Sequence, residues 1–430
     1  LLLFTSAITL LGVVFAPQIT AVVAKGYTGE KFELTVRLVR VLFPGAALLV
    51  LSAWTLGVLN THRRFFLAYA SAALWNVAMI ATLLGFGPRS TPPELVVWLA
   101  WGSVVGSLLQ FAVQVPSALR LLGSLRFQAR AHRAEVRSVV VNFGPVFMGR
   151  GVAQISGLVD AFIASLLGAG ALATLGYAQL LYMLPVSLFG MSVSAAELPE
   201  MSRLTGAFDD AREALQERLR AGLTRIAFFV VPTSVAFVTI GGEIAGLIYR
   251  SGRFGDAEAV WVWGVLAGAA VGLVASTGAR LLASSFYALG DTGTPFRYAL
   301  VRVVLSTSLG ATLALQGPEL LGIDARWSVA GITVASGIAG WVEYAMLRRA
   351  VTRRVGVVTP GAMRLLPLWS GAALAAAVAW GVRWLNAGVP ALLRSAFVLA
   401  AFGLVYWVFA WRAGVPEAQE LRRAVFRRAR

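Results

Sequence analysis

The sequence has no cysteine, only two histidines and few charged residues. Of its 430 residues, 13% are Asp, Glu, Lys or Arg, roughly half the share typical of soluble domains. Without cysteine the chain can form neither a disulfide nor a thiolate metal site. His62 and His132 fall in expected loops without further ligands at metal spacing, so we interpret both as solvated side chains. We therefore expect no metal or organic cofactor.

Catalytic motifs are missing as well. The sequence shows no carboxylate pair placed for acid–base chemistry, no Ser-His-Asp candidate and no phosphate-cradling P-loop. We therefore expect a protein that is not an enzyme and does not hydrolyse ATP. Any uphill work would then draw on an ion or voltage gradient.

Long apolar segments dominate what is present. Hydrophobic residues make up 58% of the chain, and its mean hydropathy is +0.76. Apolar stretches of about 20 residues alternate with short loops that are charged or rich in Gly and Pro, the pattern of membrane-spanning helices. We predict an all-α polytopic membrane protein, with residues 203–225 forming an amphipathic helix on the membrane surface. The twelve predicted spans cover 1–24, 31–60, 65–87, 95–119, 138–168, 171–198, 226–249, 257–289, 296–316, 327–347, 365–382 and 391–411.

The excess of basic residues has a simple reading in this topology. The chain carries 37 Lys and Arg against 20 Asp and Glu, a formal net charge of +17. Nucleic-acid binding would need these residues on one soluble face with aromatic side chains among them, whereas they lie between apolar segments, so no nucleic-acid partner is expected. About two thirds of them fall on one side of the predicted topology, which predicts cytoplasmic chain ends. The arginine pairs near residue 350 and in the tail are expected to bind anionic membrane lipids.

An internal repeat is visible in the loops. Residues 24–30 and 249–256 each end one helix and lead into a long one, and residues 59–65 match 289–296, roughly 230 residues apart. The first four helices therefore match the seventh to the tenth, and roughly 90 residues with two more helices are expected before Leu1. Two pseudo-symmetric six-helix bundles, the first represented by four helices, are typical of transporters. The predicted domains are an N-terminal bundle (1–122), a C-terminal bundle (138–350), an extra helix pair (362–412) and a basic tail (413–430).

Ionisable residues inside predicted helices are candidate functional residues, because a charge within the bilayer is costly. Arg150 lies twelve residues into its helix, which indicates either a substrate cavity or a buried ion pair. Arg280 fits cavity lining and snorkelling to the interface equally well. For Arg302, close to a helix end, we expect snorkelling. For Glu343 we expect an interfacial pair with the arginines that follow it.

A glycine stripe marks the eighth predicted helix. Gly264, Gly268 and Gly272 recur every four residues and share one face. The spacing predicts either close packing against another helix or a hinge.

Several motifs resemble one family, and they lie at residues 40–44, 59–65, 154–160, 184–190, 197–199 and 286–295. The chain is similar to the MurJ/MviN lipid II flippases, within the multidrug/oligosaccharidyl-lipid/polysaccharide exporter superfamily. The resemblance implies fourteen helices, a place in the bacterial cytoplasmic membrane, and translocation of the undecaprenyl-pyrophosphate-linked peptidoglycan precursor by alternating access. Lipid-linked glycan pyrophosphate is the implied partner, and cell-wall synthesis proteins are further candidates.

The chain departs from the family pattern in the helix 171–198. Gln179, Leu180 and Met183 stand where family members carry charged residues. Gln179 is retained as a candidate substrate-binding residue beside Arg150 and Arg280, whose guanidinium groups suit a pyrophosphate. The departure leaves two alternatives open: an exporter of drugs or of another lipid-linked oligosaccharide, and a non-transporting scaffold of cell-wall synthesis.

The resemblance also implies a site for a coupling cation, Na⁺ or H⁺. Asp160 occupies a family position associated with such a site, and Ser308, Thr312 and Ser336 would supply further oxygens. A hard cation needs several oxygen ligands, and no second carboxylate is present. The alternative is that Asp160 is a structural residue held by an ion pair or hydrogen bond.

Overall fold

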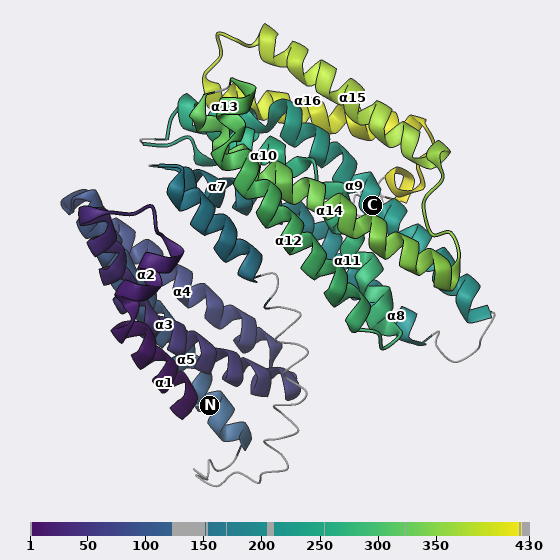
Figure 1. The fold of residues 1–430 in the computed structure, drawn as a ribbon. Helices are drawn as coiled ribbons and strands as arrows, with labels where there is room; N and C mark the ends of the chain where they lie inside the picture. Colours follow the sequence, from purple (N-terminus) through teal and green to yellow (C-terminus); the bar gives the residue numbers. More distant parts are fainter. Residues whose placement is uncertain are drawn as a thin grey trace. The chain divides into compact units, whose positions relative to one another are not determined.

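The computed structural model describes residues 2–122, 151, 154–168, 170–203, 210–252, 254–322, 324–420 and 423. The chain divides into two compact units, Leu1–Val141 and Asn142–Arg430. All regular structure in the described ranges is helical, which confirms the predicted fold class (Figure 1). Nine of these helices are long and apolar enough to span a membrane, and eleven spans result if each of two bent pairs counts as one.

The first unit is a small bundle around one long helix. Helix α5 packs along both α3 and α4. The first predicted span is broken at Phe15, where α1 and α2 meet at 72°, because Pro17 in the first turn of α2 has no amide hydrogen to continue the helix. The elements of this unit are α1 (Leu2–Val14), α2 (Ala16–Val23), α3 (Gly29–Thr61), α4 (Phe65–Phe86), η1 (Gly87–Arg89) and α5 (Pro92–Leu122).

Buried polar side chains join the helices of the first unit. The amide of Gln114 on α5 is fully buried, and it accepts hydrogen bonds from Ser52, at 2.9 Å, and from Thr55, both on α3. Its amide nitrogen donates to Ser71 of α4 at 2.5 Å. Each polar atom is thereby satisfied without water, which a buried amide requires.

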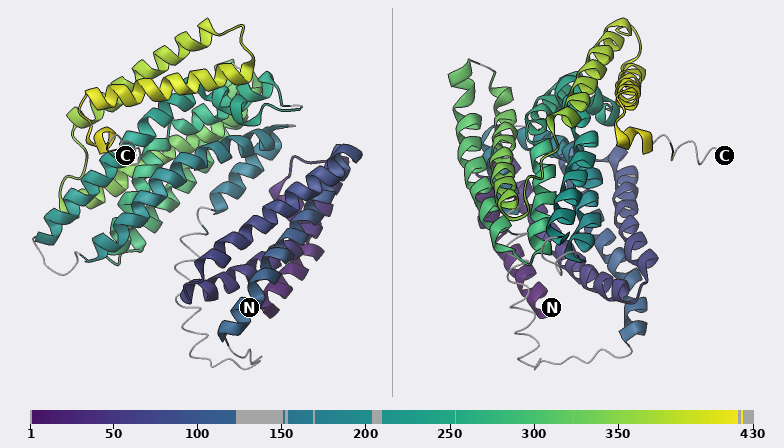
Figure 2. Two further views of the ribbon diagram at one scale, coloured as in Figure 1. Left: turned by 180° about the vertical axis from the view of Figure 1, so that it is seen from behind. Right: turned by 90° about the vertical axis from the view of Figure 1, so that its right-hand side faces the viewer.

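The second unit contains the remaining helices (Figures 1 and 2). Helix α14 packs along α12 and against α10 and α11. The main core of this unit is built from α7, α9, α10, α11 and α14. The elements are the helix Gln154–Leu166, α7 (Ala171–Pro185), the π-helical turn η2 (Val186–Met191), α8 (Ser192–Arg203), α9 (Asp210–Tyr249), α10 (Asp256–Ala270), α11 (Leu273–Ala288), α12 (Gly293–Leu315), α13 (Gly317–Leu321), η4 (Ala325–Trp327), α14 (Ser328–Val355), α15 (Ala362–Leu385) and α16 (Ala391–Arg412).

The prediction of a surface helix at 203–225 is wrong for the residues of this range that the structure describes. From Asp210 the chain runs directly into the span as helix α9, whose kink lies further along, at Ile240. Leu215 and Leu219 are buried in the core, and Arg218 pairs with Glu197 and Glu200 of α8 at 3.3 and 3.1 Å. Because one face of this stretch packs on protein, it extends the spanning helix instead of lying on lipid.

The glycine stripe packs closely, as one of its two interpretations predicted. A Cβ added to Gly268 or Gly272 would overlap α14, at Thr333 and Gly337 respectively. The predicted single helix 257–289 is also broken at Gly272, where α10 and α11 meet at 45°. Close approach to α14 therefore coincides with a bend in the helix that carries the glycines.

The helix pair α15–α16 packs against α9 and belongs to the second unit. Figure 2 shows the pair, in yellow-green and yellow, along one side of that unit. Tyr406 donates a hydrogen bond to the carbonyl of Phe228 at 2.6 Å, and the Trp380 indole donates to the carbonyl of Thr239 at 3.1 Å. Apolar packing and these bonds fix the pair on α9.

Candidate functional site

A polar cavity of about 500 Å³ lies within the second unit. Its walls come from the helix Gln154–Leu166, α7, α10, α11, α12 and α14. Ten of the lining residues are polar or charged, although such side chains are costly among membrane-spanning helices unless they face water or one another. The polar lining residues are Gln154, Ser156, Asp160, Gln179, Tyr182, Ser276, Arg280, Arg302, Thr333 and Ser336.

Helical periodicity brings these residues to one place. On each helix the lining residues recur at steps of three or four, so that they share one face. On α7 this face begins at Leu172 and runs through Gln179 to Met183, and on α12 it comprises Ala299, Arg302 and Val303. The polar faces of separate helices therefore meet around a common space.

Arg280 lines this cavity and forms no direct ion pair with any described residue. Its side chain is exposed there. A guanidinium group offers five N–H donors in a plane and stays charged in proteins. Arg280 can therefore hold an oxyanion without first giving up an internal partner.

Arg302 is paired, contrary to the expectation that it snorkels. Its Nη1 lies 3.5 Å from Oε2 of Glu343, a residue that is 9% exposed on α14. The expected pair of Glu343 with the arginines after it is therefore also wrong. Both interpretations looked along one helix, whereas the partner comes from the helix alongside.

A short hydrogen bond links two walls of the cavity. The hydroxyl groups of Tyr182 on α7 and Ser276 on α11 are 2.6 Å apart. Ser276 also donates to the carbonyl of Gly272, at the bend between α10 and α11. The cavity wall is thus tied directly to the bent part of the second unit.

The structure brings together four of the seven predicted site residues. Asp160, Gln179, Arg280 and Ser336 line the cavity, and Asp160 has no ion-pair partner in the described part of the chain. Arg150 lies outside the described residues.

Ser308 and Thr312 are not brought to Asp160. Both are exposed and absent from the cavity lining, and their hydroxyls donate to carbonyls of their own helix, those of Val304 and Ser308. Ser308 is rotated about 120° from Arg302 around the axis of α12, which accounts for its different face.

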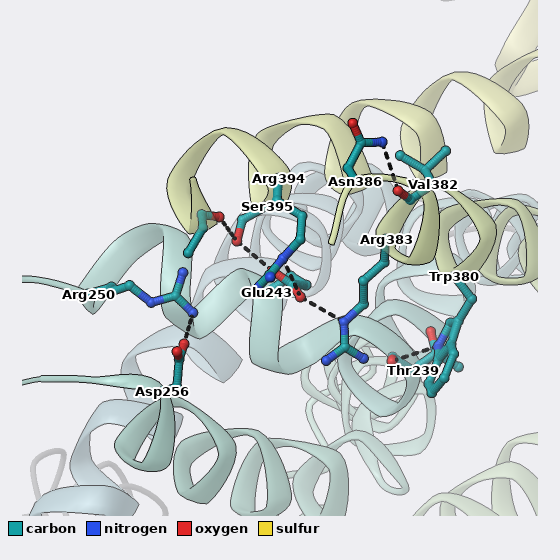
Figure 3. A network of polar contacts seen from close by, with 11 residues as sticks. Thr239, Glu243, Arg250, Asp256, Trp380, Val382, Arg383, Asn386, Arg394 and Ser395 are labelled. Carbon is teal, nitrogen blue, oxygen red and sulfur yellow. Dashed lines mark hydrogen bonds and ion pairs between the residues drawn. The ribbon is translucent and has the colours of Figure 1, made fainter. Parts of the chain in front are cut away.

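A second ionic cluster was missed from the sequence (Figure 3). Glu243 of α9 is 5% exposed, and its Oε1 lies 2.9 Å from Nε of Arg383 and 3.6 Å from Nε of Arg394. Ser395 donates to its Oε2 at 2.6 Å. Because Glu243 is the only charged residue between positions 226 and 249, the rule that an ionisable residue in a span needs a partner could have identified it.

No metal centre is indicated by the described residues. They contain no cluster of three or more His, Asp or Glu side chains able to hold a metal ion. What the cavity offers is binding chemistry: a guanidinium and a carboxylate that form no ion pair with any described residue, and several hydroxyl and amide groups.

Long apolar helices and an internal polar cavity define a multi-pass membrane transporter. Solved transporters share the fold. The structure "Lipid II flippase MurJ, inward closed conformation" matches with a TM-score of 0.77 at 21% identity, covering 95% of this chain and 80% of that one. An inward-facing multidrug resistance MATE transporter of the MOP superfamily matches with a TM-score of 0.64 at 16% identity, covering 82% and 80%.

Sequence comparison assigns the family. The family model "Lipid II flippase MurJ" matches residues 1–402. The lipid II flippase MurJ of Burkholderia cenocepacia is 29% identical, with 97% of this chain and 81% of that protein covered. A probable lipid II flippase MurJ of Rhizobium tropici is 31% identical, with 77% and 61% covered. The chain belongs to the lipid II flippase MurJ family.

Proposed function

We propose that this protein translocates lipid II across the bacterial cytoplasmic membrane by alternating access. The proposal is supported by family membership and, in the molecule itself, by Arg280 in the cavity of the second unit. Lipid II carries a pyrophosphate, and a planar guanidinium can donate two parallel hydrogen bonds to its oxygens. The observation that carries the proposal is that Arg280 has no ion pair within the described ranges.

The test is complementation in cells depleted of their own flippase. The gene should restore growth and translocation of labelled lipid II, whereas Arg280→Ala should reduce translocation about 30-fold, the effect of losing about 2 kcal/mol of charged hydrogen bonding. Arg326→Ala removes an exposed arginine outside the cavity and should leave translocation unchanged. Failure of the unmodified gene to restore translocation would reject the function. Full activity of Arg280→Ala would reject the role of this residue.

Arg150 and Gln179 complete the proposed substrate contacts. Gln179 lines the same cavity as Arg280. Its amide can donate a hydrogen bond to a phosphate oxygen, and it can donate to or accept from a sugar hydroxyl. Arg150 is proposed as a second guanidinium for the pyrophosphate because of its depth in the predicted helix 138–168.

A coupling cation, Na⁺ or H⁺, is proposed at Asp160. The support is that Asp160 and Ser336 line the cavity that contains Arg280. A cation bound at Asp160 would add positive charge to the cavity and so favour an anionic headgroup, and linkage requires the headgroup to favour the cation equally. Ser308 and Thr312, the other oxygens proposed from the sequence, gain no support from the cavity lining.

Measuring substrate affinity with and without Na⁺ tests the proposed coupling. Wild-type protein should bind lipid II more tightly in Na⁺ than in choline. Asp160→Asn should abolish the difference and bind in choline about as tightly as the wild type binds in Na⁺, because its neutral side chain no longer repels the anionic headgroup. A Na⁺ effect that persists in Asp160→Asn would place the cation elsewhere. If the affinity of the wild type for lipid II depends on pH but not on Na⁺, the coupling cation is the proton.

A different cargo is a second candidate. The observation in its favour is that Gln179 and Met183, both cavity-lining, stand where family members carry charge. An exporter of another lipid-linked oligosaccharide would bind that lipid in competition with lipid II. The family further suggests cytoplasmic chain ends and association with cell-wall synthesis proteins, and transport of this kind needs no chemical conversion by the chain.

A further inference from the structure

The turn between α3 and α4 contains the only described residue other than glycine with a positive φ. Arg63 has a φ of 58°. Its amide donates to the carbonyl of Asn60 at 3.0 Å, and the amide of Arg64 donates to that of Leu59 at 2.9 Å. These two bonds form a Schellman motif, in which the position held by Arg63 normally belongs to glycine.

The turn between α11 and α12 has the same backbone. Gly290 has a φ of 74° and donates to the carbonyl of Tyr287 at 3.1 Å, and Asp291 donates to that of Phe286 at 2.9 Å. The sequence repeat pairs these two turns, and their hydrogen bonds agree position by position. Gly290 thus corresponds to Arg63, and Asp291 to Arg64.

The charge at the second position is inverted between the two turns. Asp291 accepts hydrogen bonds from the amide and hydroxyl of Thr294 and pairs with Arg354 of α14 at 2.6 Å. The bonds from Thr294, together with Arg354, lower the pKa of Asp291 to about 2. At this end of the second unit an internal carboxylate therefore neutralises an arginine from the neighbouring long helix.

In the first unit all the charged residues described at the corresponding place are arginines. Arg63, Arg64 and Arg120 line a pocket of about 480 Å³. Arg120 lies in the last turn of α5, the helix that packs on α3 and α4 as α14 packs on α11 and α12. Arg64 thus shares a pocket with a second positive charge, Arg120, whereas its counterpart Asp291 forms an ion pair with an arginine, Arg354.

No carboxylate in the described part of the first unit can neutralise this pocket. The acidic residues there are Glu30 and Glu33, at the start of α3, and Glu94, at the start of α5. The pocket lies at the opposite ends of both helices. Helices of 33 and 31 residues are about 45–50 Å long, far beyond the range of an ion pair.

The rim of the pocket is apolar. Phe66, which is 86% exposed, lines it together with Leu67 and Leu121. These residues lie at the ends of membrane-spanning helices, the level at which lipid phosphate groups meet acyl chains. No side chain caps the first turn of α4, whereas Asp291 binds the first turn of α12. The features together suit a ligand with a phosphate and an apolar part.

We infer that the pocket formed by Arg63, Arg64 and Arg120 binds the phosphate group of an anionic phospholipid. The external phosphate takes the place that the Asp291 carboxylate holds in the second unit. Arg63 fits this reading, because a non-glycine residue in a left-handed conformation costs about 1 kcal/mol and such strain is typical of functional positions. The site is separate from the cavity around Arg280 and does not depend on the cargo proposed for it.

Native mass spectrometry of the purified full chain tests the inference. The protein is titrated with phosphatidylglycerol or phosphatidylcholine, and the dissociation constant of the first bound lipid is measured. Phosphatidylglycerol should bind selectively, and Arg64→Gln/Arg120→Gln should weaken it about 25-fold, about fivefold for each arginine. Arg89→Gln, at the other end of the unit, should change it less than twofold.

Two additional measurements separate lipid binding from a folding defect and from capture of a soluble phosphate. Arg63→Gly removes one positive charge from the pocket, so it should weaken phosphatidylglycerol binding about fivefold. Because glycine adopts the left-handed conformation of this turn without strain, the melting temperature should not fall. Inorganic phosphate and pyrophosphate, added as competitors, should not displace the lipid at concentrations that leave the protein folded. Displacement of the lipid by either anion would show that the pocket binds a soluble phosphate, and the inference of a phospholipid ligand would be wrong. Equal affinity of the wild type and the double variant for phosphatidylglycerol would show that this pocket is not the lipid-binding site.

Discussion

Two ionic clusters in the second unit use the same residue types in opposite ways. At Glu243 a buried carboxylate meets two arginines and a serine, so all its strong interactions are internal (Figure 3). Around the cavity, Arg302 is paired but Arg280 and Asp160 have no ion-pair partner within the described ranges. Charges that are satisfied internally stabilise the packing of helices, whereas charges left open in a cavity remain available for a ligand.

This difference predicts that substitutions in the Glu243 cluster lower mainly the stability of the protein, whereas substitutions of the unpaired cavity residues lower mainly the rate of transport. Removing one member of a buried pair leaves an uncompensated charge and commonly costs several kcal/mol. Removing an unpaired cavity residue leaves no such charge behind. Each variant below is therefore measured for both unfolding and translocation.

The largest effect on stability is expected for Glu243→Gln. The change leaves Arg383 and Arg394 without their carboxylate, and we expect the free energy of unfolding to fall by about 3 kcal/mol. Thermal unfolding in detergent measures it, with Glu319→Gln, a change in the short helix α13, as the control. A melting temperature equal to the wild type would show that the cluster does not hold α15–α16 on α9.

Arg280→Ala should give the converse result. Translocation is expected to fall about 30-fold, equivalent to about 2 kcal/mol, while the free energy of unfolding changes by less than about 0.5 kcal/mol because no internal ion pair is lost. Lipid II translocation and unfolding are measured on the same preparation. A large loss of stability would mean that Arg280 is structural, and the contrast between the clusters would fail.

The loss of stability caused by Glu343→Gln is expected to lie between those of Glu243→Gln and Arg280→Ala. It frees Arg302 within the cavity wall, where the guanidinium can still reach water, so the loss of stability should be about 1–2 kcal/mol. Unfolding measured beside Glu243→Gln ranks the two carboxylates. A greater loss for Glu343→Gln than for Glu243→Gln would reverse the assignment of structural and functional clusters.

Hydropathy was sufficient to predict the helical class and the positions of most spans, because apolar length alone determines what can cross a bilayer. A hinge was one of two interpretations of the glycine stripe, but the sequence placed a break neither at Phe15 nor at Gly272. The first depends on a proline whose effect varies with its neighbours, and the second on contact with Gly337, which is distant in sequence. The glycine spacing indicates that a neighbouring helix approaches closely, but it does not show at which glycine the helix bends.

The candidate site was predicted in part for a related reason. Depth in a helix indicated Arg280, and the family resemblance indicated Asp160, and both line the cavity. Helical phase would have separated Ser308 from Arg302, but only once the inward face of α12 was known. Ion-pair partners were wrongly assigned for Glu343, since neighbours along the chain were favoured over those on the adjacent helix.

The smallest effect is expected at the hydrogen bond between Tyr182 and Ser276. Tyr182→Phe should change the free energy of unfolding by about 1 kcal/mol or less, because Ser276 keeps its bond to the carbonyl of Gly272. If the bend between α10 and α11 moves during transport, the loss should alter the translocation rate more than it alters stability. A double-mutant cycle with Ser276→Ala measures the coupling, and the two single effects on rate should not add. Additive effects would show that the hydroxyl pair is only part of the cavity lining, and that the bend at Gly272 works independently of α7.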